Sequence, residues 1–177
     1  MKKVLRLCIF IFILAFLASY LLGEIEVKYK DIIDAEVEKN SLDKSLVYAL
    51  IMAESKFEPD ALSSKGAMGL MQITEDTALW CAEKMGNSAI AADITVPEVN
   101  ISIGCFYLRY LMDRFDNSES AALAAYNAGS GNVDAWLTDS SYSPDGKNIT
   151  SAPYPETDKY IKKIAFYKKM YTLLYGE

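Results

Sequence analysis

One carboxylate stands at the end of an apolar helical pattern. In LVYALIMAE, residues 46–54, Glu54 follows Leu50 by four positions and Ile51 by three, which places it on their helix face. A carboxylate on such a face loses water, and desolvation raises its pKa. A glutamate that stays protonated near neutral pH can act as a general acid. Judged by this spacing alone, a glutamate more often turns to solvent or hydrogen-bonds a backbone amide than acts as a catalytic acid.

The choice of other catalytic side chains is narrow, because the chain contains no histidine. Ser-His-Asp and Cys-His catalysis are therefore excluded, and acid–base chemistry must fall to Glu, Asp, Lys, Tyr or Cys. The commonest metal ligand is also missing, which argues against a metal site. Cys81 and Cys105 could form a disulfide or remain as two buried free thiols, and the sequence leaves both open.

The first 23 residues have the pattern of a membrane segment. MKKVLR is basic, residues 7–23 are apolar without a charge, and the acidic GEIEV follows. This order predicts that the basic end stays inside and the rest crosses the membrane. The apolar run is short for a spanning helix and long for a cleaved signal peptide. We favour a signal-anchor that holds the protein to the membrane by residues 4–22 over a cleaved signal peptide, and either places the domain outside the cytoplasm.

The rest of the chain is acidic. Residues 1–23 hold three of the 18 basic side chains and no acidic one, so 15 basic and 24 acidic side chains remain after them. An acidic domain does not attract nucleic acid or anionic lipid non-specifically, so we expect no nucleic-acid partner.

The pattern after this segment is helical throughout. Ser41 is a plausible N-cap of the helix that carries Glu54, Thr74 can cap a later one, and Gly129 ends another. Residues 138–155 form the longest polar stretch and predict a surface loop. The fold class is therefore mostly α, a single globular domain. We expect helices over residues 28–40, 40–55, 74–86, 97–115, 118–129, 131–137 and 156–175.

Four short segments share an order and spacing with a known family. They are the Glu-Ser pair at 54–55, SSKGAMGLMQ at 63–72, AAYNAG at 124–129 and YPETDKY at 154–160. Together they resemble the lytic transglycosylases of the soluble, goose-lysozyme-like type, which cleave the glycan strands of bacterial peptidoglycan. The resemblance covers residues 31–175. It implies a lysozyme-like helical domain over residues 31–177, behind a membrane segment at 1–23 and a linker at 24–30.

The resemblance also implies a role for each matching residue. Glu54 matches the single catalytic acid of the family, and Ser55 matches a residue that supports the end of its helix. Met71 and Gln72 match residues that line the sugar groove, and Tyr126 matches a tyrosine close to the acid. The substrate-binding residues implied in this way are Ser63 (or its neighbour Ser64), Met71, Gln72, Tyr126, Asn127, Glu156 and Tyr160.

The implied reaction uses one carboxylate twice. Nearby acids such as Glu58, Asp60 and Glu75 fit exposed positions, so the sequence offers no obvious second catalytic carboxylate. The resemblance implies cleavage between N-acetylmuramic acid and N-acetylglucosamine, with Glu54 as acid and then base, and with a 1,6-anhydro ring in the product. It implies that no metal or cofactor takes part. Two alternatives stay open: a muramidase of the same fold that uses water, and a non-catalytic glycan-binding module.

Overall fold

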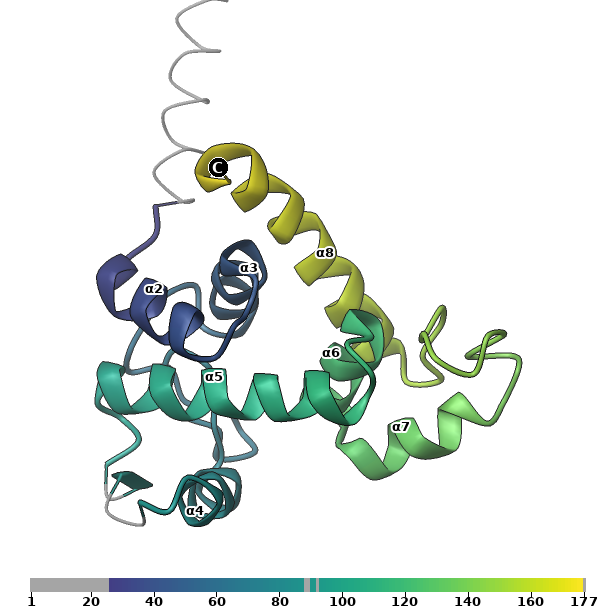
Figure 1. The fold of residues 1–177 in the computed structure, drawn as a ribbon, viewed down its shortest axis with the longest axis horizontal. Helices are drawn as coiled ribbons and strands as arrows, with labels where there is room; N and C mark the ends of the chain where they lie inside the picture. The colour runs from purple at the N-terminus through teal and green to yellow at the C-terminus, as the bar shows by residue number, and fades with distance from the viewer. Residues whose placement is uncertain (1–25, 88–89, 92, 177) are drawn as a thin grey trace, which may run out of the picture.

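The computed structural model describes residues 26–87, 90–91 and 93–176, and over them it is built from helices (Figure 1). All seven expected helices are present, and two isolated bridges, Leu62 to Met68 and Met68 to Ile73, are the β-type pairings of the described chain. The helices are α2 (Lys30–Lys39), α3 (Lys44–Glu54), α4 (Glu75–Lys84), α5 (Pro97–Arg114), α6 (Glu119–Ala128), α7 (Ser130–Leu137) and α8 (Pro155–Tyr175).

The predicted membrane segment, residues 1–23, lies outside the described residues. None of the helices in the described part of the chain combines the length and the apolar character that crossing a bilayer requires.

Helix α3 forms the centre of the larger of two apolar clusters. Its residues from Leu46 to Met52 are all buried, and α8 packs along it. Asp43, not the predicted Ser41, caps the helix: its Oδ1 accepts from the backbone N–H of Ser45 at 2.8 Å. Ser41 has a φ of 50°, so its backbone belongs to the preceding turn and its side chain cannot serve as an N-cap.

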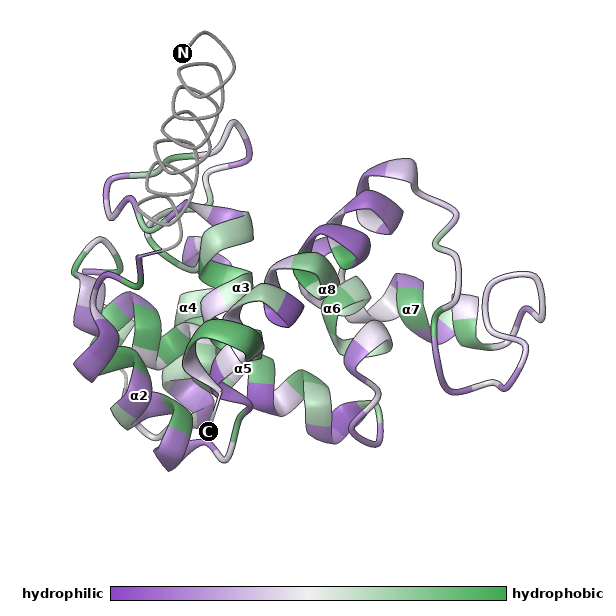
Figure 2. Cartoon of the chain, turned by 90° about the horizontal axis from the view of Figure 1, so that it is seen from above, coloured by the Kyte–Doolittle hydropathy of each residue, from purple (hydrophilic) through white to green (hydrophobic). Residues whose placement is uncertain are grey.

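Two apolar clusters share helix α5, which runs horizontally beneath α2 and α3 in Figure 1. The larger cluster joins α2, α3, α8 and the first half of α5, and the smaller one joins the end of α5 to α6 and α7. Most of these helices carry both hydrophobic and hydrophilic residues, as expected of amphipathic helices that bury one face (Figure 2). Tyr107 and Tyr126 pack against both clusters, so they mark the seam between them.

The two cysteines of the domain are free thiols. Cys81 on α4 and Cys105 on α5 are both fully buried and form no disulfide. Burial raises the pKa of the Cys81 thiol to about 12 and also raises that of Cys105. Of the two possibilities that the sequence left open, the structure has the pair of buried thiols.

Candidate active site

Glu54 is the last residue of α3 and lies against α8. Its Oε1 accepts a hydrogen bond of 2.5 Å from the Tyr160 hydroxyl. Burial raises the pKa of Glu54 to about 7, while the Tyr160 hydrogen bond and the charge of Lys163 act to lower it. No other carboxylate of the described residues contributes to this shift. Glu54 is therefore a single carboxyl group that can give up or take a proton near neutral pH.

The end of α3 is held by its neighbours. The Ser55 hydroxyl, which is buried, lies 3.2 Å from the carbonyl oxygen of Ile51 and 2.8 Å from that of Leu70. The Lys163 ammonium donates to the carbonyl oxygen of Ala53 at 2.7 Å. The Ala53 carbonyl is one of the backbone acceptors that a helix end leaves free. Together the Ser55 and Lys163 contacts tie the end of α3 to the 63–72 loop and to α8.

Asn100 on α5 holds the loop that follows Glu54. This fully buried side chain accepts from the backbone N–H of Met71 at 2.7 Å and donates to the carbonyl oxygens of Met68 and Ile94 at 2.9 and 2.8 Å. Gly69 has a φ of 76°, and a Cβ at this position would lie 2.3 Å from the Asn100 amide nitrogen. Sequence reasoning missed Asn100, whose one signal is an amide among the apolar residues of α5.

Met71 lies in the core, contrary to the expectation that its side chain lines a sugar groove. It is fully buried, and it packs on Gly104 of α5, where a Cβ would lie 2.4 Å from the Met71 sulfur. The missing side chain of Gly104 is what admits Met71 to the core. The backbone carbonyl oxygen of Met71 instead accepts a 2.8 Å hydrogen bond from the Tyr126 hydroxyl.

Tyr126 lies beside Glu54, near the end of α6. Burial and then the charge of Glu54 raise its pKa well above the ordinary value, so its phenol stays neutral. The next residue, Asn127, accepts a 2.7 Å hydrogen bond from the buried Thr157 hydroxyl. This bond joins the end of α6 to the start of α8, which brings Tyr126 and Tyr160 to the same carboxylate.

Three other predicted site residues shape or flank the loop. The Ser63 hydroxyl accepts from the backbone N–H of Ala67 at 3.0 Å. The Gln72 amide donates to the carbonyl oxygens of Ala61 and Gly69, both at 3.0 Å. Glu156 is exposed, and its carboxylate lies 3.9 Å from the Lys65 ammonium. The hydrogen bonds of the described residues connect none of these three side chains to Glu54.

The described residues form no cluster of side chains that could hold a metal ion. Within residues 26–87, 90–91 and 93–176, no three side chains of the Cys, Asp and Glu types come together as a metal site would require.

Comparison with known proteins agrees with this geometry. The chain is 32% identical over 152 residues to the soluble lytic murein transglycosylase of Escherichia coli strain K12, an alignment that covers 84% of this chain and 24% of that protein. It is 33% identical over 116 residues to the membrane-bound lytic murein transglycosylase C of Edwardsiella ictaluri, covering 60% and 32%. The chain thus spans about a quarter of the length of the first relative and about a third of the length of the second.

Solved structures show the same fold. The 70 kDa soluble lytic transglycosylase of Escherichia coli superposes with a TM-score of 0.77 at 29% sequence identity, over 86% of this chain and 25% of that one. The Transglycosylase SLT domain model matches residues 31–149, which include Glu54, the 63–72 loop and Tyr126. The chain therefore belongs to the Transglycosylase SLT domain family.

Proposed function

We propose that this protein is a murein lytic transglycosylase. It cleaves the β-1,4 bond between N-acetylmuramic acid and N-acetylglucosamine in peptidoglycan and leaves 1,6-anhydro-muramic acid ends. The observation that carries the proposal is Glu54, a single carboxyl whose pKa is raised to about 7 and whose Oε1 is held by Tyr160. The names of the relatives, which are lytic murein transglycosylases, support the same substrate.

In the proposed reaction, Glu54 acts first as an acid. Its carboxyl proton passes to the glycosidic oxygen, the bond from this oxygen to C1 of muramic acid breaks, and N-acetylglucosamine leaves with a free hydroxyl. The acetamido group of the muramic acid stabilises the cation at C1. The Glu54 carboxylate then takes the proton of the C6 hydroxyl, whose oxygen bonds C1. The carboxyl returns to its protonated state, and no water is consumed.

The neighbours of Glu54 fit this double use. The Tyr160 hydrogen bond and the Lys163 charge stabilise the carboxylate that forms after the first proton transfer, while burial favours the protonated group that starts it. Tyr126, Gln72 and Asn127 are proposed to contact the sugar chain, although their hydrogen bonds in the free protein are internal. Ser63 and Glu156 are also proposed to contact the sugar chain.

The proposed site of action is outside the cytoplasm, where peptidoglycan lies. We propose that residues 1–23 anchor the protein, that 24–30 link it and that 31–177 form the catalytic domain. A membrane-bound relative supports this arrangement. Fractionation of cells that make the full chain tests it: the protein should stay with the membrane and be cut by protease added to spheroplasts. Recovery of a shortened chain in the medium would support a cleaved signal peptide instead.

Mass spectrometry of digested peptidoglycan tests the reaction. The parent protein should release muropeptides lighter by one water than the hydrolysis products, and Glu54→Gln should lower the rate by about 10²–10⁴-fold. Thermal unfolding of both proteins checks that the variant is folded. Products with reducing ends would indicate a muramidase. Binding of peptidoglycan without release of any product would indicate a glycan-binding module.

A further inference from the structure

The last three turns of α8 carry an exposed apolar stripe. Phe166 is 63% exposed and Leu173 is 86% exposed, which makes Leu173 the most exposed large hydrophobic residue of the described chain. The two are seven positions apart, so they share one face of the helix. Leu174, which is 43% exposed, widens the stripe at the end of the helix. Exposed apolar side chains that gather in this way, instead of lying singly, indicate a surface that meets a partner.

The same helix is basic, although the domain is acidic. Residues 159–175 hold five of the 15 lysine and arginine side chains that follow residue 23, and they hold no aspartate or glutamate. Lys169 is exposed and lies between Phe166 and Leu173 on the apolar stripe, three positions after one and four before the other. A lysine in this setting lays its aliphatic stem on an apolar phase and extends its ammonium to phosphate. The stripe therefore suits the surface of a bilayer that contains anionic lipids.

The end of α8 lies beside the start of α2, close to where the described chain begins. The Lys30 ammonium donates to the Asp34 carboxylate at 2.5 Å, and the Tyr48 hydroxyl donates to the same carboxylate. The ring centroids of Tyr48 and Tyr175 lie 5.8 Å apart. Figure 1 shows the first described residues and the last turn of α8 at the same edge of the molecule, and α4 at the opposite edge. The stripe thus lies on the side of the domain to which residues 1–25 are joined.

The chain between this edge and the proposed anchor is short. Val27 is buried in the larger cluster, and the Lys28 ammonium lies 2.9 Å from the Glu58 carboxylate, so contacts with the domain hold these two residues. Glu26 follows Leu22, the end of the proposed anchor, by four positions, and four residues span at most about 14 Å. An anchor that ends in the bilayer therefore keeps this edge of the domain close to the lipid headgroups.

We propose that the C-terminal half of α8 lies on the membrane surface, with Phe166 and Leu173 at the boundary of headgroups and acyl chains and Lys169 against lipid phosphates. This inference rests on the proposed anchor, which brings the domain to the bilayer. The contact turns a domain held at one point into a domain held at two. It therefore fixes the orientation of the domain on the membrane.

The fixed orientation sets the height of the candidate active site above the bilayer. Tyr160, which holds the Glu54 carboxylate, lies 13 positions before Leu173 on the same helix. At 1.5 Å per residue, at most about 20 Å of helix separates Tyr160 from the membrane contact. The protein should therefore cleave the glycan strands that lie nearest to the membrane.

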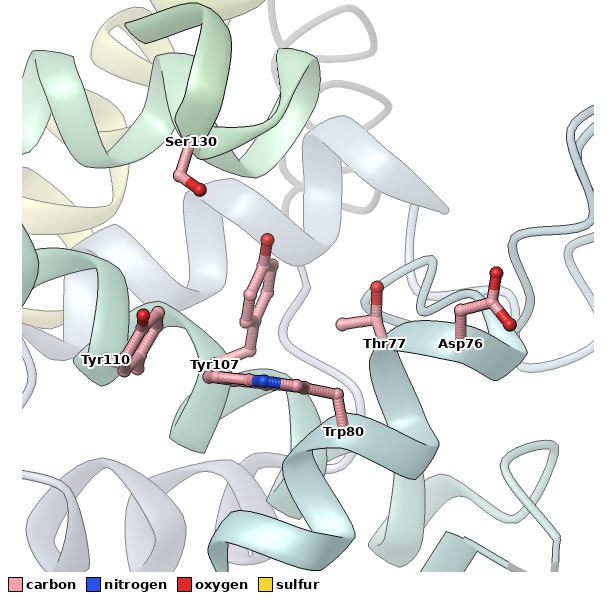
Figure 3. A pocket seen from close by; sticks show the side chains of 6 residues that line it. All are labelled: Asp76, Thr77, Trp80, Tyr107, Tyr110 and Ser130. Carbon is pink, nitrogen blue, oxygen red and sulfur yellow. The ribbon is translucent and has the colours of Figure 1, made fainter. Parts of the chain in front are cut away.

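Tryptophan emission in vesicles of brominated lipid tests the contact, because bromine on the acyl chains quenches an indole only at short range. The full chain has two tryptophans, Trp80 and Trp136, and residues 1–25 contain none. Trp80 lines a hollow of about 300 Å³ between α4, α5 and the start of α7, where Figure 3 shows it beside Tyr107 and Tyr110. Trp136 is buried in the smaller cluster. The parent protein should therefore keep its emission in brominated vesicles, and it supplies the baseline.

Leu173→Trp and Phe166→Trp are two separate reporters in the full chain, reconstituted in an equal mixture of phosphatidylcholine and phosphatidylglycerol. Each added indole should emit at shorter wavelength and lose intensity when the acyl chains are brominated. Leu79→Trp is the matched control, because Leu79 is 54% exposed but lies on α4, and its emission should follow the baseline. Lys169→Glu in the Leu173→Trp protein should weaken the contact by at least about fivefold. Lys147→Glu changes the net charge equally in the loop before α8 and should leave the quenching unchanged.

Three results would overturn the contact, and they separate it from the other proposals. Equal quenching of both reporters and of Leu79→Trp, in a chain that sediments with the vesicles, would refute the contact and leave the anchor standing. A blue shift that grows with protein density, without quenching, would assign the stripe to a second copy of the chain. A chain that stays out of the vesicles would refute the anchor and the contact together. Release of anhydro products from detached strands, which depends on Glu54, decides the catalytic proposal independently of all three.

Discussion

The Tyr160 hydroxyl donates a 2.5 Å hydrogen bond to Glu54, a residue 106 positions earlier in the chain. Tyr160 lies on α8 and Glu54 on α3, and these two helices pack along each other in the larger apolar cluster. The packing of these two helices therefore sets the position of the candidate acid and the free energy of its ionised form.

Removal of this hydrogen bond should move the pH dependence of the reaction upward. The Tyr160 phenol stabilises the carboxylate and so lowers the pKa of Glu54, and Tyr160→Phe removes this effect while keeping the ring. The free enzyme must be protonated at Glu54, so activity of the parent should fall as pH rises through about 7. In Tyr160→Phe this fall should occur at higher pH, with kcat lower by about tenfold from poorer orientation. A pH profile of kcat/KM that overlays that of the parent would rule out this role.

Lys163 should act in the same direction with a smaller effect. Its positive charge lowers the pKa of Glu54, so Lys163→Gln should shift the high-pH limb of the profile upward. Lys162→Gln is the control: it removes an equal charge from the neighbouring position, where Lys162 pairs with Asp158. The prediction fails if both substitutions move the limb by the same amount, because that would reflect net charge alone.

Glu54 should also make the stability of the domain depend on pH. Its pKa is about 7 in the folded protein against an ordinary value of 4.5, so between these values the folded state binds more protons than the unfolded one. The free energy of unfolding should therefore fall as pH rises from 4.5 to 7. Glu54→Gln should remove this contribution and stabilise the protein above pH 7, by no more than about 3 kcal/mol. Urea denaturation of parent and variant at pH 5 and pH 8 measures it; equal differences at both would contradict the assignment.

Two glycines of the 63–72 loop should respond differently to the same substitution. Gly66 and Gly69 have φ values of 79° and 76°, so alanine costs about 1–2 kcal/mol at either position. At Gly66 nothing lies within 4 Å of the added Cβ, whereas at Gly69 it meets the Asn100 amide. Gly69→Ala should therefore also break the Asn100 hydrogen bonds and lower the free energy of unfolding by at least about 2 kcal/mol more than Gly66→Ala. Thermal unfolding compares the two, and similar losses would show that Asn100 does not hold the loop.

Local signals in the sequence determined most of the helices. Thr74 caps α4 and Gly129 ends α6 as expected, because capping depends on residues within one turn of the helix end. The predicted cap of α3 was wrong by two residues. Ser41 and Asp43 are both favourable N-cap residues, and the backbone of the turn before the helix leaves only Asp43 in position to cap it. Helix existence could thus be predicted, and the exact start of α3 could not.

By itself the sequence determined a helical domain, the absence of histidine chemistry and the position of a carboxylate, Glu54, at the end of an apolar helix face. Tertiary structure alone decided what surrounds that acid. It buried Met71 against Gly104, made Asn100 the support of the loop, and set Trp80 beside Tyr107 in a separate hollow. Helical periodicity reports which face of one helix is apolar. It carries no information on which residue of another helix lies opposite, and that pairing fixes the pKa and the contacts of Glu54.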